Sequence, residues 1–191
     1  MRASEAIRFT VAVSSDMGCG LSSGLPAARA RTITARMGVF NLTDLRARLS
    51  RGARLIGLDP GARTLGLALS DVTLLLASPY GTLPRGKLGP TAAELARIAR
   101  KEGAGGLVVG LPLSMDGSFG PAAQAAKDFG RDLAAAAGLD VAFWDERLSS
   151  AAVNRAMIEA DLSRAKRAAR VDAAAAAWML QAALDATRGA A

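Results

Sequence analysis

The sequence RLIGLDPGARTLGLALS, residues 54–70, contains two short apolar runs joined by four residues that favour a turn. The runs Arg54–Asp59 and Thr64–Ser70 flank Pro60–Arg63, and this order of run, turn and run predicts a β-hairpin. Asp59 ends the first strand, where Asp-Pro-Gly also suits a type II turn with Gly61 at positive φ. The hairpin therefore starts a sheet and leaves a carboxylate at the end of its first strand.

The rest of the chain alternates between further apolar runs and helical segments. The runs that predict strands are Val72–Ala77, Gly106–Leu111 and Val141–Trp144, and residues 78–90 are expected to form a Pro/Gly-rich link. The segments that predict helices are Leu42–Leu49 with Asn41 or Thr43 as cap, Thr91 to about Gly103, Pro121 to about Ala137 with Gly138 as stop, Ser149 or Ser150 to about Ala160, and Val171 to about Thr187. This order predicts an α/β fold with a mixed five-stranded sheet, whose first three strands are antiparallel, flanked by helices on both faces.

The length of 191 residues suits one α/β domain, because a domain of about 150 residues buries ~70% of its unfolded surface and makes its own core. Residues 1–36 differ from the rest, since they are rich in Ser, Gly and Arg and have no sustained hydrophobic period. We expect them to be a disordered extension, or the product of a mis-assigned start codon upstream of a true start at Met37. The domain is thus expected over residues 37–191.

The residue types that the chain lacks exclude several kinds of chemistry. It has no His and one Cys, Cys19, which rules out a Ser-His-Asp triad, a Cys-His pair, a His-based zinc site and an internal disulfide. Catalysis has to use carboxylates, hydroxyls, Lys, Arg or a hard metal ion. The lone thiol favours a reducing compartment, which we take to be the cytoplasm. No apolar run reaches the ~18 residues of a membrane span. The excess of basic residues makes nucleic acid the first candidate partner and an anionic membrane surface the second, and of these we expect no membrane partner.

Acidic residues stand at three places that such a sheet brings to one edge. Asp59 ends the first strand, Asp145 and Glu146 end the last strand, and Asp172 is expected in the first turn of the final helix. Each also has an ordinary explanation, in a turn or at a helix N-terminus. Three converging carboxylates, however, need a cation, and oxygen-only ligands select Mg2+ or Mn2+. Because such ions activate water and stabilise the leaving oxygen of a phosphodiester, the pattern outlines a nuclease site.

A basic segment precedes the last of these acids. It carries Arg164, Lys166, Arg167 and Arg170 and no acid, in a chain whose formal charge is +7 and whose isoelectric point is near 10.7. The same segment would also be ordinary as a solvated loop. Beside an acidic edge it would hold the phosphates that the carboxylates repel, so nucleic acid is the expected partner.

Four blocks of sequence carry a resemblance to a known family. They are GLDPGARTLGLALSD (57–71), VVGLPLSMDGSFGP (108–121), WDERLS (144–149) and SRAKR (163–167) with the following Val171–Asp172. They occur in this order within residues 54–187. The chain resembles the YqgF/RuvX family, the Holliday-junction-resolvase-like group of the RNase H-like superfamily. The resemblance implies an RNase H-like fold and a nuclease that matures the precursor of 16S ribosomal RNA, with junction resolution on DNA as the older proposal.

By the same resemblance, the catalytic and metal-binding acids would be Asp59, Glu146 and Asp172, with Mg2+ or Mn2+ as cofactor. Asp145 and Asp116 are the alternatives for the middle acid. The residues that would face nucleic acid are Arg147, Ser163, Arg164, Lys166, Arg167 and Arg170.

The loop 110–117 would border this site. The block that contains it departs from the usual family form, because Ser114 stands where Asn is common and Phe119 where Glu is common. We expect the protein to be a monomer or a weak dimer.

Two other functions fit part of the sequence. The ATPase group of sugar kinases, actin and chaperones also has Asp-x-Gly between a strand and a hairpin, but those proteins need a second domain of similar size, for which residues 37–191 leave no room. A weakly catalytic or non-catalytic RNA-binding factor in ribosome assembly would need the same fold and the same basic segment. Cleavage assays separate that factor from an active nuclease.

Overall fold

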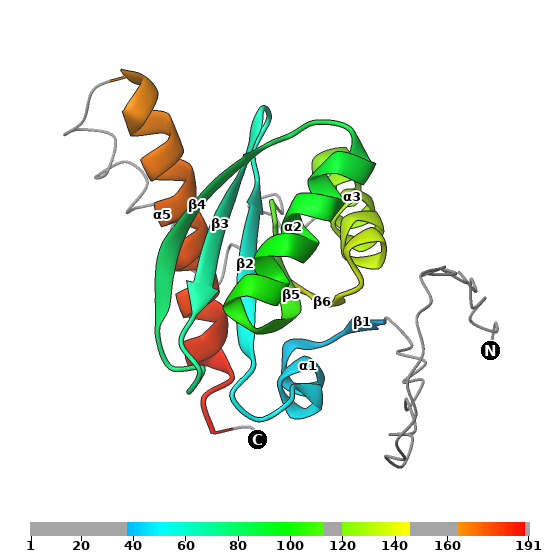
Figure 1. The fold of residues 1–191 in the computed structure, drawn as a ribbon, viewed down its shortest axis with the longest axis vertical. Coiled ribbons are helices and arrows are strands. Elements are labelled where there is room, and N and C mark those ends of the chain that lie inside the picture. Colours follow the sequence, from blue (N-terminus) through cyan, green and yellow to red (C-terminus); the bar gives the residue numbers. More distant parts are fainter. Residues whose placement is uncertain (1–37, 113–119, 146–163, 190–191) are drawn as a thin grey trace, which may run out of the picture. The chain divides into compact units, whose positions relative to one another are not determined.

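The computed structural model describes residues 38–112, 120–145 and 164–189, with residues 164–170 as backbone only. Its centre is a six-stranded mixed sheet in the order β1-β6-β5-β2-β3-β4 (Figure 1). The strands are β1 (Val39–Phe40), β2 (Arg54–Pro60), β3 (Thr64–Ser70), β4 (Ala77–Pro84), β5 (Ala104–Leu111) and β6 (Asp140–Asp145). The helices are α1 (Leu42–Arg48), α2 (Leu88–Glu102), α3 (Pro121–Ala137) and α5 (Arg164–Ala186). The α/β class predicted from the sequence is confirmed.

The strand directions follow from the connections. β2, β3 and β4 are antiparallel neighbours, whereas β5 and β6 extend the sheet from β2 in parallel. β1 pairs in parallel with β6 through Val39–Val141 and Phe40–Ala142. The sheet therefore has six strands instead of the predicted five, because a two-residue strand has no alternation for a sequence pattern to reveal.

The predicted strand Val72–Ala77 is wrong, because Asp71 folds the segment after it into a turn. The Asp71 carboxylate accepts hydrogen bonds from the backbone N–H groups of Leu76 at 3.0 Å and Leu75 at 2.8 Å. Leu74 adopts a φ of 56° within the turn. The bond from Leu76, and then that from the Thr73 hydroxyl, lower the pKa of Asp71 to about 2, so the carboxylate is charged at neutral pH.

The third of the antiparallel strands is instead β4, which lies almost entirely within residues 78–90, the segment that was expected to be a link. Its prolines, Pro79 and Pro84, argue against a central strand, since proline cannot donate to a strand ladder. β4 lies at the edge of the sheet, with β3 as its one neighbour, and an edge strand tolerates proline on its outer side.

Helices cover both faces of the sheet, as predicted. Along β2, Ile56 and Leu58 belong to the buried cluster under α2 and α3, whereas Leu55 belongs to the cluster under α1 and α5. The same alternation holds in β3, where Leu67 faces α2 and Ala68 faces α5. The face toward which any strand residue points can therefore be read from its neighbours.

Helix ends agree with the sequence except at the starts of α2 and α5. α2 begins at Leu88 rather than at the predicted Thr91. The Asn41 side chain accepts a hydrogen bond from the Asp44 N–H, and Gly103 and Gly138 end α2 and α3 in the left-handed conformation. α5 begins at Arg164 rather than at the predicted Val171, so the basic segment is helical and the alternative of a solvated loop is wrong. Ala, Lys and Arg all favour helix, and the segment contains no other residue type.

The helix expected from Ser149 or Ser150 to Ala160 and the extension expected over residues 1–36 lie outside the described residues. In the part of the chain that the structure describes, no helix has the length and apolar character to cross a bilayer.

Candidate active site

Asp59 and Asp172 meet at the end of the β2–β3 hairpin through Gly66. The antiparallel register sets Asp59 of β2 opposite Gly66 of β3. A Cβ atom added to Gly66 would lie 2.1 Å from the carbonyl oxygen of Asp172 and 2.6 Å from its carbonyl carbon. The backbone of α5 therefore rests directly on Gly66, next to Asp59, and residues distant in the sequence come together at one edge of the sheet.

A second glycine, Gly57 in the neighbouring strand β2, allows α5 to lie close to the sheet. A Cβ on Gly57 would lie 2.8 Å from the Cβ of Leu180 and 3.2 Å from the carbonyl oxygen of Ala176. Residues 172, 176 and 180 are spaced by one helical turn, so α5 runs over the two glycines along one side. Asp59 lies two residues after Gly57, so it points toward the same face of the sheet, the face that α5 covers.

The Asp172 carboxylate is held by a hydroxyl of the hairpin. Thr64, the first residue of β3, donates a hydrogen bond from Oγ1 to Oδ2 of Asp172. Asp59, Thr64 and Asp172 are all half-buried, so the group is accessible at the sheet edge. Asp172 also lies about two turns inside α5, which removes the helix N-terminus as an explanation for its position.

The turn after Asp59 differs from the predicted one. Gly61 does not have positive φ, so the expected type II turn is wrong. Glycine is needed there because the backbone at residue 61 passes close to that of Thr64. A Cβ on Gly61 would lie 2.7 Å from the carbonyl oxygen of Thr64. The turn thus brings the residue after Pro60 close to Thr64, the partner of Asp172.

Strand alternation places Asp145 away from this group. Phe143 in β6 faces α3, since a Cβ on Gly130 of α3 would lie 3.1 Å from its ring. Trp144 packs against the cluster under α1 and α5. Asp145, one residue farther, therefore points to the α2–α3 face, opposite to Asp59.

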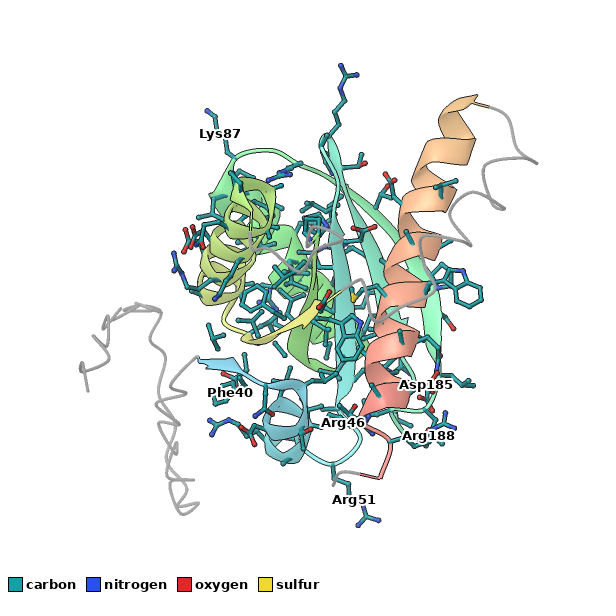
Figure 2. All side chains as sticks on the ribbon, turned by 180° about the vertical axis from the view of Figure 1, so that it is seen from behind. Phe40, Arg46, Arg51, Lys87, Asp185 and Arg188 are labelled. Carbon is teal, nitrogen blue, oxygen red and sulfur yellow. The ribbon has the colours of Figure 1, made fainter. Side chains whose placement is uncertain are left out.

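Several predicted residues lie outside the described part of the chain. These are Glu146, Asp116, Arg147 and Ser163, whereas Arg164, Lys166, Arg167 and Arg170 are described as the backbone of the first turns of α5. Figure 2 shows these turns at the same end of the molecule as the β2–β3 turn. Within the described side chains, no three His, Cys, Asp or Glu residues are grouped so as to hold a metal ion. The structure thus brings together two of the three predicted acids.

The sequence analysis missed Thr64 as a member of the site. The sequence did contain one indication. Thr64 is two residues before Gly66, and alternate residues of a strand point to the same face, so Thr64 lies on the face that contains Gly66. Its partner could not be known without the packing of α5.

Comparison with known proteins identifies the family. The model of the RuvX family, described as Holliday junction resolvase, matches residues 53–186. The chain belongs to the RuvX family. This confirms the resemblance carried by the four sequence blocks.

Related proteins match most of the RuvX-family chain. A protein of Acidiphilium cryptum is 66% identical over 149 residues, which are 78% of this chain and 94% of that protein. One of Gluconacetobacter diazotrophicus is 63% identical over 152 residues, 79% of this chain and 99% of that protein. Both bear the name "Putative pre-16S rRNA nuclease". Among solved structures, RuvC of T. thermophilus in complex with Holliday junction substrate matches 72% of this chain and 97% of that chain, with 17% identity and a TM-score of 0.46.

Proposed function

We propose that this RuvX-family chain is a metal-dependent endonuclease that hydrolyses phosphodiester bonds in the precursor of 16S ribosomal RNA, in the cytoplasm. The observation that carries the proposal is the contact of the Asp172 backbone with Gly66 beside Asp59, which joins two carboxylates at one sheet edge. The names of the relatives support RNA as the substrate, and the family description supports branched DNA as a second one. The proposed nuclease domain is residues 37–191, a range that contains the family match over 53–186.

Asp59, Asp172 and Glu146 are the proposed ligands of Mg2+ or Mn2+. The donors that the structure brings together are carboxylate and hydroxyl oxygens, which suit a hard cation, and the chain has no His. Glu146 is preferred over Asp145, because Asp145 points to the other face of the sheet. When bound, the cation would supply an activated water and stabilise the charge on the leaving oxygen.

The protein's own groups have separate roles in this proposal. Asp59 and Asp172 concentrate negative charge at the edge of the sheet, and Thr64 fixes the orientation of the Asp172 carboxylate. The basic first turns of α5, with Arg147 and Ser163, bind the phosphates of a substrate that the acids alone would repel. A monomer or a weak dimer is sufficient, because the described acids come from one chain.

Removal of divalent metal tests the function directly. We expect the full chain to cleave a precursor 16S rRNA transcript, and more slowly a synthetic four-way DNA junction, in Mg2+ or Mn2+, and to cleave neither in EDTA. Gel electrophoresis of labelled substrates measures both. Equal cleavage in EDTA would exclude the metal mechanism. Binding of the transcript without cleavage in any metal would support the RNA-binding assembly factor instead.

Replacement of Thr64 tests the positioning of Asp172. Thr64→Val keeps the branched shape and removes the hydroxyl, and loss of such an orienting partner lowers metal affinity or activity about 10- to 100-fold. We expect a higher Mn2+ concentration for half-maximal cleavage, whereas Thr64→Ser, which retains the donor, restores the wild-type value. If Thr64→Val and wild type have the same metal dependence, the hydroxyl has no positioning role.

A further inference from the structure

Three exposed cations surround the turn that follows Asp59. Arg63 lies in the β2–β3 turn, and Arg85 and Lys87 lie in the connection from β4 to α2. The two connections are joined directly, since the Arg85 backbone N–H donates to the Arg63 carbonyl at 2.9 Å and Arg85 Nη1 donates to the Gly61 carbonyl at 2.8 Å. We call Arg63, Arg85 and Lys87 the basic corner.

No acid in these connections neutralises the basic corner. Asp71 is the one acid between residues 60 and 93, and it lies just beyond the opposite end of β3. The acids of the helices packed nearby have other partners, because Glu94 of α2 is bound by Arg97 at 2.6 Å and Asp128 of α3 by Arg131 at 3.2 Å.

The members of the basic corner are available to a ligand. In the described part of the chain, Arg63 and Lys87 form no ion pair, so their charges face solvent. The Arg85 guanidinium is held by the Gly61 carbonyl and by the ring of Phe129, whose centroid is 4.9 Å away. A guanidinium has five N–H donors, so this anchoring leaves donors free in a fixed plane, which suits a phosphate.

The basic corner and the basic turns of α5 lie on two sides of the acids. Arg85 stacks on α3, on the α2–α3 face of the sheet, whereas α5 covers the other face together with Asp59 and Asp172. Figure 2 shows Lys87 and the first turns of α5 at one end of the molecule, and Arg51 and Arg188 toward the other end.

We propose that the basic corner binds the sugar-phosphate backbone of the nucleic acid substrate, on the side of Asp59 opposite to the basic turns of α5. This rests on the proposed function, and it extends the contact surface across the sheet edge so that the strand passes over the acids between two positive regions. Its contacts are to phosphates, so they hold any sequence equally and fix the position of the strand.

A pair of matched double variants tests the basic corner. Arg63→Ala with Lys87→Ala removes two exposed charges at the corner, and Arg51→Ala with Arg188→Ala removes two exposed charges at the far end. Fluorescence anisotropy of a labelled RNA hairpin in EDTA measures binding without cleavage. We expect the corner variant to bind about tenfold more weakly, and the slope of log K against log[salt] to fall by about 2, with no such change in the control. Two hairpins of different sequence should show the same loss.

The outcomes separate this proposal from the proposed function. Unchanged binding by the corner variant, or an equal loss in both double variants, would overturn the role of the corner even if the wild type cleaves RNA. A wild type that never cleaves, but binds through the corner, would overturn the nuclease function alone. The charge-preserving variant Arg63→Lys with Lys87→Arg should bind like the wild type, which excludes a folding defect at these positions as the cause.

Discussion

Asp59→Asn is expected to reduce cleavage of precursor rRNA to a trace, by about a hundred- to a thousandfold, while binding stays intact or becomes slightly tighter. Asn has nearly the same shape as Asp but lacks the charge that holds a divalent cation, and loss of a group that stabilises developing charge costs about 10²–10³ in rate. Binding does not suffer, because one of the charges that repel phosphates is gone. Single-turnover cleavage in saturating Mn2+ and anisotropy in EDTA measure the two effects separately.

The control for Asp59→Asn is Asp185→Asn. Asp185 is an exposed residue near the other end of α5, where it pairs with Arg188 at 3.0 Å, so the substitution changes the net charge equally but far from the proposed site. We expect wild-type cleavage from the control. Normal cleavage by Asp59→Asn would mean that the acids at this edge do not perform the reaction.

Gly66→Ala is expected to lower the free energy of unfolding by about 3 kcal/mol and to reduce cleavage sharply. The new methyl group would meet the Asp172 carbonyl oxygen at 2.1 Å, and this atom belongs to the backbone of a helix, which cannot turn aside as a flexible side chain would. α5 must therefore lift from β3, and Asp172 moves away from Asp59 with it. Urea denaturation at neutral pH measures the stability, and the cleavage assay measures the site.

Gly81→Ala provides the matched control in the neighbouring strand. Gly81 lies in β4, pairs with Leu67, and has no atom within 4 Å of an added Cβ. We expect it to be neutral or slightly stabilising, since alanine restricts the unfolded chain. Equal stability of the two alanine variants and the wild type would show that α5 does not press on Gly66.

The sequence was informative where local chemistry decides the structure. The apolar runs around Pro60–Arg63 form the predicted hairpin, and Gly103 and Gly138 end their helices as predicted. The sequence was misleading where contacts with the rest of the fold determine the local structure. Val72, Leu75 and Leu76 are apolar but exposed, with Val72 at 51% and Leu76 at 64%, because the Asp71 turn takes precedence over β-propensity.

For the candidate site, the sequence predicted the meeting of Asp59 and Asp172 but not its cause. Glycines 57 and 66 appear in the sequence as ordinary strand residues, and their function becomes clear when α5 is seen lying on them. The contact from Thr64 could not be predicted either, because it depends on the register of α5 against β3. The catalytic roles of Asp59, Glu146 and Asp172 stay predictions until the cleavage assays are done.

The continuity of α5 has a mechanical consequence. Arg164 and Asp172 belong to one unbroken helix, so they cannot move independently, and a load on the first turns is transmitted along a stiff rod to the carboxylate. Gly66 lies directly under this helix and is the point of contact about which the helix would pivot. A nucleic acid strand bound at the first turns of α5 would therefore adjust the orientation of the Asp172 carboxylate. Without a bound strand, no such force would act on the carboxylate.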